Sequence, residues 1–402
     1  MRILSISILA CALVHAQSGG MNMVDMNPSS MYLSNLASGT SVNPDAWPMP
    51  MRMAPLGRWN TMWMGNGFLV DTQQTGPRGH DKLYSTNWIM GSAEHRLGSR
   101  GAFQAVLMLS LEPATVTNRS YPLLFQTGET AYGKPLIDAQ HPHNFIMALG
   151  FHYTNEVAEQ TFLDLYFAPV GDPALGPVAF PHRASALEIP QAPISHHLQD
   201  STHISDEVLT AGIQRKKVKL EASGFHGAEP GENRWTIQTG AIDSWSARVW
   251  YFPSANWAAQ VSAGRLHHPE ALEPGDQFRS SASVAYTKGR WSSSLIWGRV
   301  RVAATRANLN SYLAESVASV ARKNFVTGRI EVADKDELSV PGVYRIRAYT
   351  AGYTRDIDLV RSFETGVGAN ISFYSIPESL KPIYSDHPAG INVYLRVRLR
   401  GN

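Results

Sequence analysis

Residues 390–400 restrict the fold of this chain more than any other stretch. From Ile391 to Leu399 apolar side chains stand at every second position, and Asn, Tyr and Arg stand between them. Successive side chains of a β-strand point to opposite faces, so this alternation predicts a strand with one apolar and one hydrated face. Helical periodicity is nearly absent along the chain. The sequence therefore indicates an all-β protein.

Similar segments recur along the chain and predict about sixteen strands, within a range of roughly 12–18. The segments centre on residues 59–70, 83–96, 101–111, 145–154, 161–168, 206–214, 217–226, 241–251, 256–264, 278–288, 291–300, 310–321, 324–333, 342–354, 360–375 and 390–400.

The connections between these segments alternate in length. Short turns such as 98–100 and 215–216 follow every second strand, whereas most other connections are long, above all 112–144 and 169–205. Alternating short turns and long loops are typical of outer-membrane barrels. We therefore expect residues 58–402 to form a single antiparallel transmembrane β-barrel in the bacterial outer membrane. Lipid would surround it, and its long loops would share one end.

The first residues predict export. A positive start precedes an apolar run from Ile3 to Val14, and Ala16 ends a small-residue cleavage site, so residues 1–16 read as a signal peptide. The single cysteine, Cys11, lies inside that run, and the exported chain would have no thiol. The formal net charge of +2, with no basic cluster, gives no reason to expect a nucleic-acid partner.

Residues 17–57 differ in composition from the barrel and predict a flexible N-terminal segment. Methionines recur there at alternate positions, beside Gly, Asn and Pro. Thioether sulfur is a soft ligand that favours Cu(I), and a Met-x-Met pair places two sulfurs on one side of an extended chain. The alternative is an apolar linker. The candidate metal ligands are Met21, Met23, Met26, Met49, Met51 and Met53.

Histidines gather in one stretch, because residues 138–207 hold seven of the fourteen in the chain. His141-Pro142-His143 has a His-x-His spacing, which projects both rings from one face of an extended backbone. Imidazole suits Zn and Cu, and carboxylates can complete a site or orient the rings. The alternative is that these histidines hydrogen-bond to loop carbonyls. The candidate ligands and supporting groups are His141, His143, His196, His197, His203, Asp138 and Asp200.

Arginines in three of the predicted strands stand at the parity opposite to the apolar residues and predict a basic wall facing the lumen. Such a wall can steer anions. The alternative is an ordinary hydrated interior in which the arginines pair with acids. The residues are Arg299, Arg301, Arg345, Arg347, Arg396 and Arg398.

Ser201 lies between Asp200 and His203, which are the residue types of a serine hydrolase. A catalytic triad is defined by its geometry and not by proximity in sequence. No other nucleophile motif accompanies Ser201 in the sequence. We therefore expect a protein that is not an enzyme, with an outer-membrane serine hydrolase as a third alternative.

Five motifs cover most of residues 120–300. They are Gln140-His141-Pro142-His143-Asn144, Gly171-Asp172-Pro173-Ala174-Leu175-Gly176-Pro177, Pro181-His182-Arg183, His196-His197-Leu198-Gln199-Asp200-Ser201-Thr202-His203 and Phe225-His226-Gly227-Ala228-Glu229-Pro230. Together they resemble a family of largely uncharacterised outer-membrane β-barrel proteins of diderm bacteria. That family often has an acid in place of Asn144. The methionine-rich segment is similar to the leader of copper-resistance outer-membrane proteins, which implies copper handling.

Our leading hypothesis is an outer-membrane barrel that binds or passes a transition metal, copper or else zinc, in metal homeostasis or resistance. Periplasmic metal-handling proteins would then be its partners. The alternative is a passive porin or structural barrel whose loop histidines only lock a constriction.

Overall fold

The computed structural model describes residues 26–273 and 275–401 of the 402-residue chain. The predicted signal peptide and two of the candidate ligands, Met21 and Met23, lie outside the described residues.

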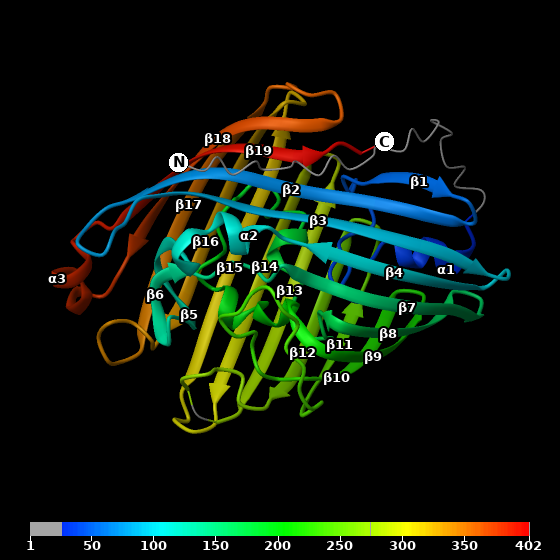
Figure 1. Ribbon diagram of the computed structural model, residues 1–402, viewed down its shortest axis with the longest axis horizontal. Coiled ribbons are helices and arrows are strands. Elements are labelled where there is room, and N and C mark those ends of the chain that lie inside the picture. Colours follow the sequence, from blue (N-terminus) through cyan, green and yellow to red (C-terminus); the bar gives the residue numbers. More distant parts are fainter. Residues whose placement is uncertain (1–25, 274, 402) are drawn as a thin grey trace, which may run out of the picture.

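Sixteen antiparallel strands form a closed barrel (Figure 1). Closure is complete because β9 pairs with β10 and the last strand, β19, pairs with β2. The result confirms the predicted fold class and strand number, and each predicted segment coincides with a strand. The strands are β2 Trp59–Gln74, β3 Lys82–Leu97, β4 Gly101–Leu109, β7 Ile146–Ala158, β8 Thr161–Gly171, β9 Ser205–Arg215, β10 Val218–Phe225, β11 Ser244–Tyr251, β12 Trp257–Leu266, β13 Gln277–Lys288, β14 Trp291–Val302, β15 Asn308–Val320, β16 Asn324–Lys335, β17 Tyr344–Asp356, β18 Phe363–Ser375 and β19 Ala389–Leu399.

The two faces of the sheet take opposite kinds of side chain. In β19, Val397 is exposed on the outside whereas Arg396 and Arg398 are buried inside. The exterior carries large exposed apolar residues on successive strands, such as Leu295 on β14 and Val261 on β12. An apolar band around a closed sheet is the outer surface of a membrane barrel. The protein is therefore located in the bacterial outer membrane.

The predicted basic wall of the lumen is largely wrong. Among its six residues, only Arg396 and Arg398 face inward. The other four are exposed and share the outward parity of Leu295 in β14 or Tyr349 in β17, close to the strand ends that adjoin the loops, where the outward face is no longer apolar. These four are Arg299, Arg301, Arg345 and Arg347.

Short turns lie at one end of the barrel and most of the longer loops at the other, as predicted. Turns of a few residues join β3 to β4 and β9 to β10, and we call their end the short-turn end. At the opposite, long-loop end, residues 110–145 connect β4 to β7 and residues 172–204 connect β8 to β9.

Three long loops and the N-terminal segment carry their own structure. Residues 110–145 contain a two-stranded hairpin, β5–β6, that the sequence did not predict. No helix in the described part of the chain is long and apolar enough to cross a membrane. A short strand, β1 Arg52–Leu56, extends the barrel sheet by pairing with the first residues of β2. The elements outside the barrel wall are α1 Pro28–Ser34, α2 Glu112–Thr115, η2 Thr117–Arg119, β5 Tyr121–Ala131, β6 Lys134–Gln140, η3 Phe180–His182, η4 His196–Leu198, η5 Ser201–His203, η6 Glu378–Leu380 and α3 Lys381–Tyr384.

Residues 26–44 of the N-terminal segment lie inside the barrel rather than free of it. Asn27 caps α1 by accepting a hydrogen bond from the Ser30 amide, and its own side chain donates to the Gly101 carbonyl at the short-turn end. Further on, the Lys219 ammonium donates to the Thr40 carbonyl at 2.7 Å. The expectation of a flexible segment over residues 17–57 does not hold for its described part. Polar contacts with the inner wall fix it, and composition alone does not reveal them.

Replacing a lipid-facing side chain by lysine should destabilise the barrel. Leu295 on β14 is 62% exposed, and Leu295→Lys is expected to cost about 2–4 kcal/mol of unfolding free energy, because a charge then faces hydrocarbon. Leu359 is 69% exposed in the turn between β17 and β18, and Leu359→Lys should change the same quantity by less than about 0.5 kcal/mol. Urea unfolding in lipid vesicles measures both. Equal effects would contradict the assigned exterior.

Asp172, the residue after β8, should make stability depend on pH. Its carboxylate accepts from the Ser38 hydroxyl at 2.7 Å, and burial raises its pKa to about 7. Because the unfolded carboxyl has a pKa of about 3.9, the stability from the neutral form is fully present below that value and is lost as the pH rises through about 7. Asp172→Asn stays neutral at every pH. The variant should therefore match the unmodified protein near pH 4 and exceed its stability at pH 8 by about 2–4 kcal/mol.

Urea unfolding at both pH values measures this difference. Asp386→Asn, an exposed loop position, is the matched control and should show no such trend. A pH-independent effect of Asp172→Asn would contradict the prediction.

Candidate metal centre

The loop of residues 172–204 fills the centre of the barrel. Nearly all of its residues are buried, although it has no regular structure beyond three short 3₁₀ turns. Arg183, which is almost fully buried, donates to Asp200 at 2.9 Å within the loop and lies 3.3 Å from Glu315 on the inner face of β15. A buried charge is tolerated when it is paired. The loop is thus fixed to the wall through compensated charges.

A second buried ion-pair group fixes the same loop to β19. Glu188 bonds Arg396 at 2.5 Å and Arg398 at 2.8 Å, and all three side chains are buried. These are the two arginines of the predicted basic wall that do face inward. They bind a carboxylate of the protein, which favours the interpretation of a paired interior over a free anion path.

The hairpin β5–β6 is anchored by Asp138, which was expected to support a metal. The carboxylate of Asp138 accepts from Arg78 at 2.7 Å, from the Phe125 amide at 2.8 Å and from the Tyr384 hydroxyl at 3.1 Å. These contacts do not include any of the five candidate histidines. Asp138 therefore holds the hairpin and is not placed at the candidate centre.

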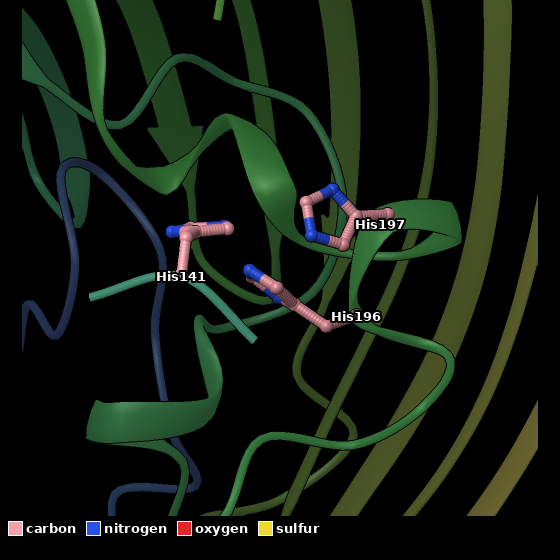
Figure 2. A group of neighbouring side chains, drawn as sticks. All are labelled: His141, His196 and His197. Atoms are coloured by element: carbon pink, nitrogen blue, oxygen red, sulfur yellow. The ribbon is translucent and has the colours of Figure 1, made fainter. Parts of the chain in front are cut away.

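Three of the candidate histidines meet in the interior. His141 follows β6, and His196 and His197 belong to η4 of the central loop. One ring nitrogen from each lies within 4.8 Å of the others, and Figure 2 shows the three rings directed toward a common space. This spacing allows one ion to contact all three imidazoles.

The two remaining candidate histidines extend this group. The ring centroid of His203 lies 5.2 Å from that of His196 and 5.4 Å from that of His143. All five predicted histidines therefore converge, although they come from two loops far apart in sequence. We call the set His141, His143, His196, His197 and His203 the imidazole cluster.

The rings of the cluster are oriented as ligands usually are. His196 Nδ1 bonds the Asp200 carboxylate at 2.8 Å, and His203 Nδ1 bonds the Asp200 backbone carbonyl at 2.8 Å. Among the described residues, Nε2 of His197 and Nε2 of His203 have no hydrogen-bond partner. A metal-binding histidine commonly donates one ring nitrogen to a carboxylate or carbonyl and leaves the other for the ion. Asp200 occupies the supporting position that the sequence suggested for it.

Burial favours the uncharged form of three rings of the cluster, those of His141, His197 and His203. It lowers the pKa of His141 to about 3, and burial followed by the neighbouring His196 lowers the pKa of His197 and His203 well below the usual value. The neutral imidazole is the form that binds a metal. The interior thus offers unprotonated nitrogen donors at neutral pH.

Two acidic residues of the site were missed in the sequence. Glu112 on α2 accepts from the backbone amide of His143 at 2.8 Å and from its Nδ1 at 2.9 Å. Glu129 on β5 lies 3.0 Å from Nε2 of His141 and is ion-paired with Arg234. Both residues precede the histidine motifs by many positions, in a stretch that reads as an ordinary loop. No local pattern marks them.

The methionines expected as ligands lie elsewhere on the inner side. Met49, Met51 and Met53 are partly buried and pack against an apolar cluster on β2 to β4, and Met26 is partly buried before α1. These contacts place the three methionines against the buried methionines of β2 to β4. Copper capture by this segment stays a prediction.

Ser201 does not form a catalytic triad. Its hydroxyl accepts from Arg279 at 2.5 Å and donates to Glu229 at 3.1 Å. Within the described residues no hydrogen bond joins it to a histidine. The hydrolase alternative thus lacks the geometry that it requires.

No protein-family model and no curated protein matches this sequence. Solved structures do match in fold. OmpF of Salmonella typhi, in complex with daunomycin, has a TM-score of 0.54 at 8% identity, over 86% of this chain and 99% of OmpF. An anion-selective porin from Comamonas acidovorans has a TM-score of 0.54 at 12% identity, over 84% of this chain and all of that porin. Such low identities establish the fold alone: this chain is an outer-membrane β-barrel with the architecture of the porins.

Proposed function

We propose that this porin-like barrel is a constricted one, in which residues 172–204 form the constriction and buried polar contacts lock it. The proposal rests on the hydrogen bonds that this loop makes with strands on several sides of the barrel wall. Its backbone accepts from Asn66 on β2, its Gly176 amide donates to Ser262 on β12, and its Gln191 exchanges hydrogen bonds with Asn370 on β18. A loop fixed on several sides narrows the lumen permanently.

The buried ion pairs of Glu188 with Arg396 and Arg398 hold the loop of residues 172–204 to β19. Burial raises the pKa of Glu188, but Arg398 and Arg396 outweigh burial and hold the pKa below its ordinary value. The carboxylate is therefore ionised at neutral pH and paired with both guanidinium groups. Removing one partner of a buried pair costs about 3–5 kcal/mol, since the remaining charges are left uncompensated.

A second candidate function is transition-metal binding at the constriction, and the spacing of His141, His196 and His197 favours it. Three imidazoles with one ring nitrogen each within 4.8 Å of the others suit Zn(II) or Cu(II). Such an ion would cross-link the loop of residues 110–145, which carries His141, to the loop of residues 172–204, which carries His196. In this function the barrel would store or pass the metal rather than admit small solutes freely.

Glu188→Gln should loosen the constriction. We expect a single-channel conductance in planar bilayers above that of the unmodified protein, and faster tryptic cleavage after Arg183, because the loop loses about 3–5 kcal/mol of docking free energy. Glu378→Gln is the matched control. Glu378 pairs with Lys381 at the surface with its side chain 85% exposed, so this change should cost less than about 1 kcal/mol and leave conductance unaltered. Identical conductance in both variants would remove the constriction proposal.

Replacing His141 and His197 together by Ala should abolish metal binding at the cluster. In titrations of the tag-free barrel with Zn(II) or Cu(II), we expect the tightest class of sites to weaken at least about tenfold, since two of three donors are lost. The double variant His80→Ala/His387→Ala, at two exposed loop positions, should bind as the unmodified protein does.

A second control addresses a rival site. His267 and His268 form a more exposed group with Asp276 near the long-loop end, and their replacement by Ala tests whether that group holds the ion instead. Unchanged affinity on loss of His141 and His197, together with metal-independent conductance, would leave the passive porin with locking histidines as the function.

A further inference from the structure

A row of methionines crosses the inner wall of the barrel on neighbouring strands. Met64 on β2 lies opposite Met90 on β3, and Met90 lies opposite Met108 on β4. Met62 on β2 and Met147 on β7 complete the group, and each of the five is at most 6% exposed. We call Met62, Met64, Met90, Met108 and Met147 the methionine wall.

The composition of this row sets it apart. Elsewhere the inner face mixes apolar side chains with hydroxyl and charged groups, as in β11, where Ser246, Arg248 and Trp250 are buried. Methionine is a common filler of apolar cores. Unlike the other apolar patches of the interior, however, this one carries a sulfur donor on each of five side chains on four neighbouring strands.

The methionine wall borders a small cavity. Its volume is about 40 Å³, and its lining includes Met62, Met90, Met108, Met147, His182 and His203. About 10–15 Å³ measured in this way holds one water molecule. The cavity therefore has room for a small ion but not for an organic substrate.

Nitrogen donors face the same cavity. His182 Nε2 lies 3.1 Å from the sulfur of Met108, and His203 contributes an Nε2 without a hydrogen-bond partner among the described residues. Asp172 also lines the cavity and adds one carboxyl that can balance a positive charge.

We propose that Met90, Met108 and His182 form a binding site for a soft monovalent cation, Cu(I), on the methionine wall. Thioether sulfur with one or two imidazoles favours Cu(I) over Zn(II), which prefers imidazole and carboxylate. The site is separate from the three-histidine group of the imidazole cluster and does not depend on it. His203 borders both, so an ion that leaves the wall would meet the cluster next.

The test uses the full chain folded in detergent and titrated with Ag(I) in chloride-free buffer, because Ag(I) is a soft monovalent ion that air does not oxidise. Met90→Leu/Met108→Leu removes two sulfurs at nearly constant volume, which cores tolerate. We expect one tight equivalent of Ag(I) to be lost or weakened at least tenfold, while Zn(II) binding stays unchanged. Met31→Leu, at an exposed position of α1, is the matched control and should keep both.

The reverse pattern is expected for the His141→Ala/His197→Ala variant, which should lose Zn(II) and keep Ag(I). The two proposals can thus fail separately. Full Ag(I) affinity in Met90→Leu/Met108→Leu would overturn the soft site. Loss of both metals in that variant would overturn its separateness from the cluster.

A measurement on the unmodified protein tests the site even if the variants do not fold. X-ray absorption of the Cu(I)-loaded barrel should show both sulfur and nitrogen neighbours around copper. A copper spectrum with nitrogen and oxygen neighbours alone would overturn the proposal.

Discussion

The structure depends on one constraint, which is that a chain in a lipid bilayer must satisfy its backbone hydrogen bonds internally. A sheet achieves this only by closing on itself, and here pairing of β19 with β2 closes it. Closure of sixteen strands creates a wide interior. Because the outer face is given over to apolar side chains, most polar side chains of the wall point inward. Whatever fills the interior must then pair with those groups.

The N-terminal segment and the loop of residues 172–204 pair with the polar groups of the wall through charged and amide groups, and not through apolar packing alone. Arg183 and Glu188 of the central loop each bind opposite charges of the wall, and Lys219 of the wall binds the N-terminal segment. Each contact is directional, so each segment has one place in which its polar groups are satisfied. Because these contacts hold both loops in place, the histidines of the two loops lie at a fixed distance from one another. Mobile loops would not hold them so.

The barrel was predictable from the sequence, and its contents were only partly so. Period-two alternation located every strand of the wall, because the two environments of the sheet impose it residue by residue. The histidine motifs indicated a site because they lie in long loops, and the long loops at one end of a barrel come close together. The partners Glu112 and Glu129 were not foreseen, since only tertiary packing brings them to the rings. The prediction that Arg299 and Arg345 face the lumen was wrong, because alternation tells the two faces of a strand apart but does not show where the apolar band ends.

The N-terminal segment enters from the short-turn end and the central loop from the other, and the two touch in the middle. The Asn43 side chain donates to the carbonyl of His182 at 3.0 Å and accepts from the Ala184 amide at 3.2 Å. Ser38 likewise holds Asp172. A displacement of residues 38–43 would thus shift the 3₁₀ turn that carries His182. In this way the short-turn end of the barrel is mechanically coupled to nitrogen donors that are buried away from it.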